Sequence, residues 1–412
     1  MSDKLISLTS LIKEGKNISI LSQGGTGKST LISTVQRQLE ESLKFDVTST
    51  TGVSAYLIGG RTIHSFCGIG VLYSKHTVQD TLKKIKKNKD AKNRIINCQL
   101  LVIDEISMMG GSYFDRLNEV CKIIRGNNKP FGGIQLIVTG DFYQLPPIDD
   151  TYCFESNSWA ELDLQPIVLE KVYRYTDQTY AGILARVRKA THTPDDIVEL
   201  FKRVKAYNQL DTDALEIQPT FLTSKRIDVD EKNNDELAKN PNETVFYRSS
   251  DDMNGDLLEG VAPSILKLKV GAQVMLTVNV DVEGGLTNGA RGVVTQLGSD
   301  HIFVKFKNGR SVSFERHPYM IEEDKKVMAK RSQFPICLAY CLSIHKSQGS
   351  TLDCAVIEAG NSIFSHHSVY VALSRVRSLD GLYLKNFNPY KITVDPRVVA
   401  FYEKENEKEK EI

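Results

Sequence analysis

The chain has 412 residues, of which 41% are hydrophobic, 25% are charged and 8% are aromatic. This length predicts roughly two to four compact units, and the composition excludes a wholly disordered chain. Fifty-two basic residues against 51 acidic residues leave a net charge of +1. That balance neither favours nor excludes a nucleic-acid partner, because it can conceal local asymmetry.

The sequence also bears on the compartment. No apolar run approaches the length of about 18 residues that a membrane-spanning helix needs, and the first residues lack the features of a secretory signal or a transit peptide. The seven cysteines are scattered and form no CxxC pair, which argues against a disulfide scaffold and against a zinc module. We therefore expect a soluble intracellular protein with no membrane partner.

The first half of the chain alternates short apolar runs with segments of helical period, a pattern typical of a parallel α/β sheet. The expected strands are 17–21, 47–51, 100–103 and 134–139. Ligands of open α/β sheets bind beyond the carboxyl ends of the strands. The loops that this geometry would gather around one site are 22–30, 104–107 and 140–147.

Two segments depart from this pattern. Between Lys75 and Arg94, eight basic residues against two acidic residues give a local charge of +6, and residues 66–96 are an expected excursion from the sheet. Residues 260–334 contain short alternating strands with glycine-rich turns, which predicts a small antiparallel β insert. The α/β pattern then returns at 337–344, 355–358 and 369–373.

The loop SQGGTGKST at 22–30 predicts a phosphate site. Glycines between a strand and a helix leave backbone N–H groups free to surround a phosphate at the positive end of the helix. Lys28 would reach the terminal phosphates of a nucleotide, and the Ser29 hydroxyl would ligate Mg²⁺. Ser22 replaces the first glycine of the usual pattern, so the alternative is a glycine-rich turn that binds nothing. The residues expected to bind the nucleotide are Gly24, Gly25, Thr26, Gly27, Lys28, Ser29 and Thr30.

Two further loops would supply the chemistry of hydrolysis. An apolar strand ends in Asp104, which is expected to hold Mg²⁺, and Glu105, which is expected to polarise the attacking water. Gln144 in the loop 140–147 could sense the γ-phosphate. Taken alone, the acid pair could be a cap or a solvated turn, and the second loop could be a rigid connector. Together with the lysine loop, they indicate nucleotide hydrolysis.

These motifs, in this order and spacing, resemble those of the superfamily 1B helicases. TGVSAYLIGGRTIHSF (51–66) is similar to the family's first DNA-contacting motif. AYCLSIHKSQGSTLD (339–353) and VYVALSRVRSLDGLYL (369–384) are similar to its last two. Residues 115–137 resemble the signature segment of the petite-integration-frequency (PIF) helicases. The resemblance covers about residues 17 to 385.

The resemblance implies an α/β fold with two RecA-like P-loop NTPase lobes. It also implies a small inserted domain in the first lobe and an SH3-like, β-rich insert in the second. The implied boundaries are 1–65 and 97–172 for the first lobe, 66–96 for its inserted domain (a candidate DNA wedge), 173–230 and 335–400 for the second lobe, and 231–334 for its insert. Residues 401–412 form a charged tail, in which the mixed charges of 403–412 indicate solvation.

The resemblance further implies ATP-driven 5′→3′ movement on single-stranded DNA and unwinding of tailed or forked duplexes, in replication, repair or recombination. A monomer is expected to act, with accessory proteins as further partners. By matching motif, Arg174 and Arg375 would reach the γ-phosphate, and Gln348 and Gly349 would join the nucleotide site. The expected DNA-binding residues are Thr51, Gly52, Thr62, His64, Phe66, Thr223, His345, Lys346 and Ser347. The candidate stacking residues are Phe66, Tyr73 and Phe142, and residues 223–226 would line the DNA groove.

Two departures from the family pattern stand out. Residues 1–22 contain no Gln to recognise adenine, and Tyr175 stands where the family commonly has Gln.

Two alternative functions also remain. One is a P-loop protein that binds single-stranded nucleic acid and uses ATP as a switch without unwinding, and the other is a RecD-type or RNA-directed helicase. The 115–137 segment disfavours the second, because RecD-type relatives generally lack it.

Overall fold

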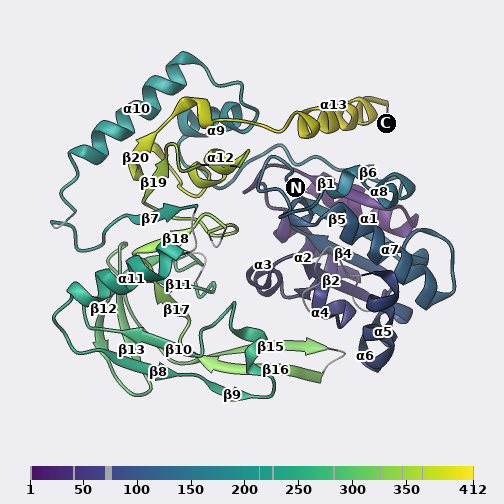
Figure 1. The fold of residues 1–412 in the computed structure, drawn as a ribbon, viewed down its shortest axis with the longest axis horizontal. Helices are drawn as coiled ribbons and strands as arrows, with labels where there is room; N and C mark the ends of the chain where they lie inside the picture. Colours follow the sequence, from purple (N-terminus) through teal and green to yellow (C-terminus); the bar gives the residue numbers. More distant parts are fainter. Residues whose placement is uncertain are drawn as a thin grey trace. The chain divides into compact units, whose positions relative to one another are not determined.

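The computed structural model describes residues 2–39, 42–69, 77–212, 214–224, 227–281, 284–323, 326–345, 347–363 and 365–411. Its contacts divide the chain into two units (Figure 1). Unit 1 consists of Met1–Tyr173 and Pro396–Ile412, and unit 2 is Arg174–Asp395. Residues 335–400 are expected to lie together in the second lobe, whereas the residues from Pro396 onward belong to unit 1.

A six-stranded parallel sheet forms the centre of unit 1, in the order β3-β2-β4-β5-β1-β6. The sheet matches the expected alternation of strands and helices. β4 is buried along its whole length, which explains why it reads as a continuous apolar run. The strands are β1 (Ile18–Leu21), β2 (Phe45–Ser49), β3 (Arg61–Thr62), β4 (Leu100–Asp104), β5 (Gln135–Gly140) and β6 (Gln165–Pro166).

Helices pack against this sheet. α1 (Ser2–Lys13) and α2 (Lys28–Leu39) bury their apolar sides in one core with alternate strand residues such as Ile18, Ile20 and Val102. Strand alternation places Leu101 and Ile103 on the opposite face, where they are also buried. No described helix combines the length and the apolarity that crossing a membrane requires. The other helices of unit 1 are α3 (Gly52–Leu57), α4 (Ile63–Cys67), α5 (Val78–Lys87), α6 (Lys89–Asn97), α7 (Gly111–Arg125), α8 (Asn157–Glu161), α13 (Pro396–Glu411), and the short 3₁₀ turns η1 (Ile106–Met108), η2 (Pro130–Gly133) and η3 (Cys153–Glu155).

The basic excursion contains a pair of helices, α5 and α6. A reciprocal capping box of Thr77 and Asp80 begins α5. Arg94 of α6 is buried, and its guanidinium donates to the carbonyls of Ser65 and Phe66 in α4, at 2.9 and 3.0 Å. α6 is thereby anchored to the segment 51–66. Residues 70–76 of the expected domain lie outside the described residues.

The C-terminal residues from Pro396 are helical, and Phe401 and Tyr402, at the start of the predicted charged tail, pack against other aromatic side chains. Val398 is completely buried, and the Phe401 ring stacks on Phe154 with 4.4 Å between centroids. Val398, Phe401 and Tyr402 recur at a spacing of three and four residues, which places them on one side of a helix. The dense charges that follow Tyr402 conceal this apolar side in the sequence.

Unit 2 contains a four-stranded parallel sheet in the order β18-β7-β19-β20. Thr193 and Asp196 form a capping box at the start of α10, with Pro194 in its first turn. The strands and helices of this part are β7 (Thr220–Thr223), β18 (Cys341–Ser343), β19 (Ala355–Ala359), β20 (Leu382–Phe387), α9 (Gln178–Arg188), α10 (Pro194–Asn208), α11 (Ile227–Lys239), α12 (Ser368–Leu373), η5 (Leu379–Gly381) and η6 (Pro389–Lys391).

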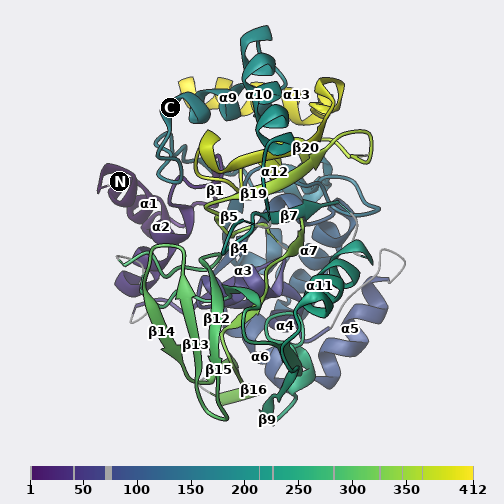
Figure 2. The same cartoon turned by 90° about the vertical axis from the view of Figure 1, so that its left-hand side faces the viewer.

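The antiparallel strands predicted for 260–334 are present, but the insert begins earlier, at β8, and ends later, at β17, in the segment expected to return to the α/β pattern. A five-stranded sheet has the order β14-β13-β12-β11-β17, and Figure 2 shows β12, β13 and β14 side by side. Two smaller sheets, β10-β8 and β15-β16-β9, complete the insert. Its elements are β8 (Val245–Arg248), β9 (Ser250–Asp252), η4 (Gly255–Leu258), β10 (Ile265–Leu268), β11 (Gln273–Leu276), β12 (Arg291–Leu297), β13 (Ile302–Phe306), β14 (Ser311–Phe314), β15 (His317–Glu323), β16 (Lys326–Gln333) and β17 (Ile336–Leu338).

An ion pair joins the insert to the parallel sheet of unit 2. The Arg291 side chain on β12 is fully buried and lies 2.7 Å from the Asp353 carboxylate. Lys307 contributes a second cation, 3.0 Å from the same carboxylate. The pKa of Asp353 is lowered, since burial, which raises it, is outweighed by the charges of Arg291 and Lys307. Asp353 is the last residue of the motif at 339–353, so the pair connects the insert to that motif.

Candidate functional site

The carboxyl edge of the sheet in unit 1 gathers the expected chemical groups. Ser49 on β2 is the register partner of Asp104 on β4, and Leu21 on β1 is the partner of Gly140 on β5. β4 and β5 are also parallel neighbours. The loops that follow β1, β2, β4 and β5 therefore begin at one edge, as the sequence predicts.

The loop after β1 has the conformation of an anion-binding turn. Gly25 and Gly27 have φ angles of 84° and 88°, in the region that glycine adopts without strain. Lys28 is the first residue of α2, and no acidic residue lies in the first turn of that helix. Nζ of Lys28 donates to the carbonyls of Ser22 and Gln23, at 2.6 and 3.0 Å. Backbone and lysine therefore form a compact cradle at a positive helix end, which fits a phosphate group.

Ser22, which replaces the first glycine of the usual pattern, has a structural role. Its hydroxyl accepts a hydrogen bond of 2.8 Å from the Leu169 N–H, and its own N–H donates to Gly140 O at 3.1 Å. Farther along the same connection, the Tyr173 N–H donates to Gly25 O at 2.8 Å. The serine thus links the phosphate loop to the segment around Leu169. These hydrogen bonds leave the conformation of the loop compatible with phosphate binding.

Asp104 is the buried last residue of β4. Burial raises the pKa of its carboxyl, while a hydrogen bond from the Thr139 hydroxyl and the charge of Lys28 lower it. Ser29 is exposed in the first turn of α2. A hydroxyl and a carboxylate are oxygen donors of the kind that Mg²⁺ prefers, so these two residues fit a Mg²⁺ site.

Glu105 has an unusual backbone conformation. Its φ of 53° and ψ of 42° lie in the left-handed region, which a non-glycine residue occupies at a cost and which is enriched at functional sites. Two hydrogen bonds hold the chain here: Thr50 Oγ1 donates to Glu105 O at 3.1 Å, and the Met108 N–H donates to the same carbonyl at 3.1 Å. The turn directs Glu105 out of the strand direction, immediately beside Asp104.

Gln144 lies in a turn that begins at Asp141. The Gln144 N–H donates to Asp141 O at 2.9 Å, and the Tyr143 N–H donates to the Asp141 carboxylate at 3.1 Å. Gln144 itself is 4% exposed. Its position follows the end of β5, the strand between β1 and β4, so it belongs to the same edge as the phosphate loop and the acid pair.

Unit 2 brings together the two arginines expected from the family. Arg174 Nη1 donates to Ser374 O at 3.5 Å, and Arg375 Nη2 donates to Ser374 Oγ at 2.7 Å. Arg375 is 1% exposed and also donates to Val371 O and Ser347 O, at 2.9 and 3.4 Å. Its guanidinium is therefore held by the backbone of its own unit.

Several expected DNA-binding residues of unit 1 have structural roles. The side chains of Thr51 and Thr62 accept from the N–H groups of Ser54 and Ser65, which makes them the N-caps of α3 and α4. Gly52 begins α3. The His64 ring lies 5.1 Å from the Tyr113 ring, and burial lowers the pKa of His64. These residues shape the two short helices of the motif, and contact with DNA remains a prediction for them.

The expected stacking residues need correction. Phe66 and Phe142 are both 0% exposed, so neither ring is accessible to a base in this fold. An aromatic residue beside polar motif residues looks the same in a sequence whether it packs in the core or contacts a ligand. Tyr73 lies outside the described residues, as do Lys225 and Arg226 of the loop 223–226.

The expected DNA-binding residues of unit 2 lie at the carboxyl ends of two neighbouring strands. Thr223 on β7 is the register partner of Ser343 on β18, and the Ile344 N–H donates to Thr223 O at 2.9 Å. His345 and Ser347 follow β18 directly, and Lys346 lies outside the described residues. Ser347 and the nearby Gln348 are buried, and Gly349 has a φ of 83°. The turn that follows β18 therefore lies at the carboxyl ends of β7 and β18, where the sequence predicts DNA-binding residues.

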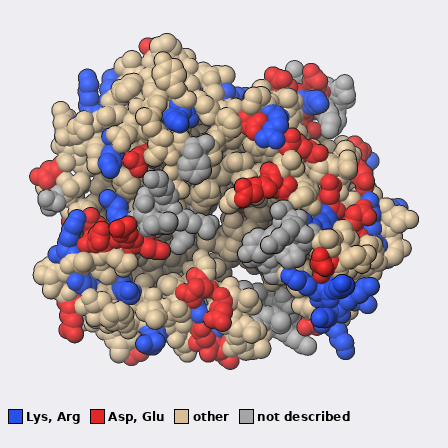
Figure 3. All heavy atoms as spheres, viewed as in Figure 1, with Lys and Arg blue, Asp and Glu red and all other residues tan. Residues whose placement is uncertain are grey.

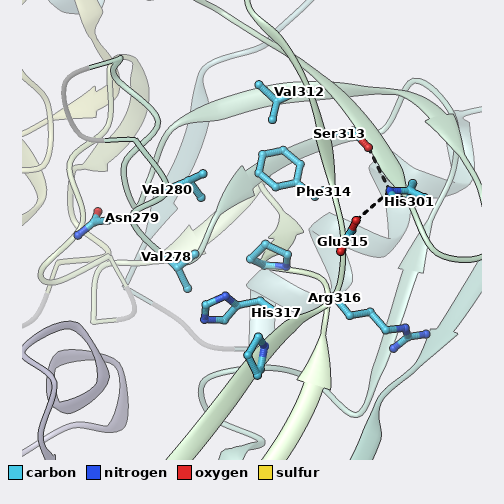
Figure 4. A pocket seen from close by; sticks show the side chains of 12 residues that line it. Val278, Asn279, Val280, His301, Val312, Ser313, Phe314, Glu315, Arg316 and His317 are labelled. Atoms are coloured by element: carbon cyan, nitrogen blue, oxygen red, sulfur yellow. Dashed lines mark hydrogen bonds and ion pairs between the residues drawn. The ribbon is translucent and has the colours of Figure 1, made fainter.

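The β insert has a separate pocket of about 570 Å³ (Figure 4). Val278, Val280 and Phe314 supply much of its apolar lining, and His301 lies 3.9 Å from the carboxylate of Glu315. All its lining residues belong to the segment 278–335. None of the site residues expected from the sequence contributes to it, so this pocket is distinct from the phosphate site.

Comparison with known proteins decides the family. Residues 3–189 match the model described as PIF1-like helicase, and residues 256–297 match the DNA helicase Pif1 2B domain. A curated "ATP-dependent DNA helicase Pif1" from Bdellovibrio bacteriovorus is 33% identical over 414 residues, which cover 98% of this chain and 91% of the relative. The chain belongs to the PIF1-like helicase family. The family assignment from the sequence is therefore confirmed.

Other PIF1-like proteins are longer than this chain. The "ATP-dependent DNA helicase PIF1" of Danio rerio is 36% identical over 416 residues, and the match covers 98% of this chain but 64% of the relative.

A Bacteroides Pif1 helicase solved with ADP-AlF3 and single-stranded DNA has a TM-score of 0.67 and 27% identity, with 98% of this chain and 97% of that chain covered. The predicted fold class is confirmed by this likeness and by the two parallel sheets.

Some contacts around the candidate site could not be predicted from the sequence. Thr139 is hidden inside an apolar strand, and only its place one residue before Gly140 hints at a role at the sheet edge. Ser22 looked like a defect of the loop. The contact of Tyr402 with the loop after β5 joins residues far apart in the chain, and no local motif signals it.

Proposed function

We propose that this chain is an ATP-dependent DNA helicase that moves 5′→3′ along single-stranded DNA and separates duplex strands. The observation that carries the proposal is the meeting of Lys28, Asp104 and Glu105 at one edge of the parallel sheet. The names of the PIF1-like relatives support the same activity. The proposed setting is DNA replication, repair or recombination, with a monomer as the acting form and accessory proteins as further partners.

The hydrolytic step follows from these groups. The phosphate loop would bind the β- and γ-phosphates through its N–H groups and Lys28. Glu105 would accept a proton from water as the water oxygen bonds to the γ-phosphorus and the bond to the bridging oxygen breaks. Gln144 would orient the water or sense the γ-phosphate. The products are ADP and inorganic phosphate.

Ser29 and Asp104 are the residues that would hold Mg²⁺. A bound Mg²⁺ would neutralise phosphate charge during phosphoryl transfer. Asp104 must be ionised for this role, and the hydrogen bond from Thr139 together with the charge of Lys28 favours its ionised form.

Arg174 and Arg375 are the proposed arginines for the γ-phosphate, and Gln348 and Gly349 are proposed to belong to the same nucleotide site. A guanidinium neutralises charge that develops in the transition state, and it couples conformation to the presence of the phosphate. The two arginines share Ser374 as a hydrogen-bond partner, so a shift of one would be felt by the other.

Binding of single-stranded and forked DNA is proposed for two sets of residues at the strand ends. In unit 1 they are Thr51, Gly52, Thr62 and His64, and in unit 2 they are Thr223, His345, Lys346 and Ser347. The lysines of α5 and α6 would add phosphate contacts. Figure 3 shows Lys and Arg side chains gathered over these two helices, and six of the lysines are exposed: Lys83, Lys84, Lys86, Lys87, Lys89 and Lys92.

The test compares two matched duplexes, one with a 5′ single-stranded tail and one with a 3′ tail, in the presence of ATP and Mg²⁺. We expect unwinding of the 5′-tailed duplex only. Glu105→Gln should abolish unwinding while single-strand binding stays detectable, because the substitution removes the base and leaves the DNA-binding residues in place. Lys28→Ala should do the same.

The outcomes separate the alternatives. Unwinding from the 3′ tail would refute the polarity. Unwinding retained in Glu105→Gln would refute the catalytic role of Glu105. An absence of both unwinding and hydrolysis stimulated by DNA would favour the ATP-switched binding protein. Stronger stimulation by RNA than by DNA of equal length would favour an RNA-directed enzyme, since the two polymers differ chiefly in the 2′-OH.

A further inference from the structure

The aromatic side of α13 is seated on the loop that follows β5. The Tyr402 ring stacks on Tyr143, with 4.7 Å between centroids and 7° between planes. The Phe401 ring meets Phe142 edge-on at 5.2 Å. These two loop residues directly precede Gln144, so the last helix of the chain covers the turn that carries the proposed γ-phosphate sensor.

The Tyr402 hydroxyl makes two polar contacts with this turn. The Phe142 N–H donates to Tyr402 Oη at 3.1 Å, and Oη donates to Asp141 Oδ1 at 3.4 Å. Asp141 and Phe142 are both completely buried. A buried N–H that loses its acceptor carries a full desolvation penalty, so the hydroxyl is needed for this arrangement of the backbone.

Asp141 transmits the contact to Gln144. Its carboxylate accepts from the Tyr143 N–H at 3.1 Å, and its carbonyl accepts from the Gln144 N–H at 2.9 Å. Tyr402 therefore holds Asp141, whose carboxylate and carbonyl both accept hydrogen bonds within the turn that ends at Gln144. Tyr402 does not itself belong to the phosphate loop or the acid pair.

We propose that Tyr402 is a positioning residue for ATP hydrolysis, which acts through Asp141 and the turn that places Gln144. The inference rests on the proposed function, because it requires that Gln144 act on the γ-phosphate or the water. It gives α13 a role in catalysis that its sequence, with its dense charges, does not suggest. A misplacement of a catalytic group by a fraction of its hydrogen-bond length lowers the rate without preventing substrate binding.

The test is Tyr402→Phe, which keeps the ring and its stacking but removes the hydroxyl. We expect kcat for ATP hydrolysis with single-stranded DNA to fall about five- to tenfold, as expected for the loss of one or two buried hydrogen bonds, while KM for ATP changes less than about twofold. Hydrogen exchange at the Phe142 amide should become faster. Tyr390→Phe is the matched control, because Tyr390 is 90% exposed, and it should leave kcat unchanged.

A double-substitution cycle then separates positioning from general stability. If Tyr402 acts through Gln144, Tyr402→Phe should have almost no further effect on kcat in a Gln144→Ala background. An equal fall of kcat in both backgrounds would overturn the proposal, as would an unchanged kcat in the single variant. A wild-type chain that hydrolyses no ATP would overturn the proposed function, and this role with it, whereas an active wild type unaffected by Tyr402→Phe would overturn the role alone.

Discussion

At the scale of single residues, Asp104 shows how opposing influences act on the ionisation of a buried carboxyl. Burial raises the pKa of its carboxyl, and the hydrogen bond from Thr139 and the charge of Lys28 oppose that rise. Only the ionised form can hold a cation. Thr139, which lies inside an apolar strand, therefore tunes the acid that the proposed Mg²⁺ site requires.

Thr139→Val should move the acidic limb of the pH profile for ATP hydrolysis to higher pH. The substitution removes one of the influences that lower the pKa of Asp104, so the carboxylate takes up a proton at a higher pH than before. The measurement is kcat/KM for ATP at saturating single-stranded DNA and Mg²⁺, from about pH 5 to pH 8, because this ratio reports ionisations of the free enzyme.

Thr48→Val is the matched control for this experiment. The Thr48 hydroxyl is buried in the same sheet and donates to Val102 O at 2.6 Å, so its removal costs a similar hydrogen bond without touching Asp104. Its acidic limb should stay at the wild-type pH. An unmoved limb in Thr139→Val, or an equal movement in Thr48→Val, would contradict the role given to Thr139.

The residues that the sequence predicts share one property, which is that their signal is local. Lys28 lies in the loop after one apolar strand, and Asp104 and Glu105 lie at the end of another, so their place beside these strands identifies them. Thr139 with Asp104 and Ser22 with Leu169 are joined across 35 and 147 residues. Such pairs are set by the order of strands in the sheet, which no single segment of the sequence records.

At the scale of elements, strand length decided what could be foreseen. The long apolar runs of β4 and β5 are visible in the sequence, whereas β3 and β6, with two residues each, are too short for any period to be seen. α13 was missed for a different reason. Its apolar side consists of three residues that are followed by a run of charged residues. Because the segment as a whole is highly charged, its composition hides this apolar side.

Asp353→Asn should weaken the attachment of the β insert within unit 2. The substitution leaves the fully buried Arg291 side chain without its carboxylate, and an unpaired buried charge is costly. Asp353 is itself 32% exposed, so we expect a loss of about 1–3 kcal/mol in the free energy of unfolding, less than for a wholly buried pair. Urea unfolding followed by intrinsic fluorescence measures it.

The pH dependence gives a second check on this ion pair. The pKa of Asp353 is lowered in the folded state, so its contribution is present at neutral pH and is lost as the pH falls from the unfolded value, near 4, through the lower folded value. Asp281→Asn is the control, since Asp281 and Arg310 form a pair that is about 40% exposed on both sides. Equal losses in the free energy of unfolding in Asp353→Asn and Asp281→Asn would contradict the larger stabilisation expected from the pair of Arg291 and Asp353.

At the scale of the whole molecule, charge is balanced overall but not locally. A net charge of +1 provides almost no long-range attraction for DNA. Attraction must then come from local surfaces, and the exposed lysines of α5 and α6 form one of them (Figure 3). Arg94 of α6 is buried and donates to backbone carbonyls. It therefore stabilises the fold and does not contribute to this exposed basic surface.

Substitution of Lys83, Lys84, Lys86 and Lys87 by Gln should weaken forked-DNA binding and reduce its salt dependence. If each lysine neutralises one phosphate, the slope of log K against log salt should become shallower by about 3, because each contact releases most of one counterion. The matched control replaces four exposed lysines elsewhere, Lys202, Lys205, Lys239 and Lys267, and gives the same net charge. Binding is measured by titration between about 50 and 200 mM salt. A slope that falls equally in both variants would mean that total charge, not the surface of α5 and α6, governs the encounter with DNA.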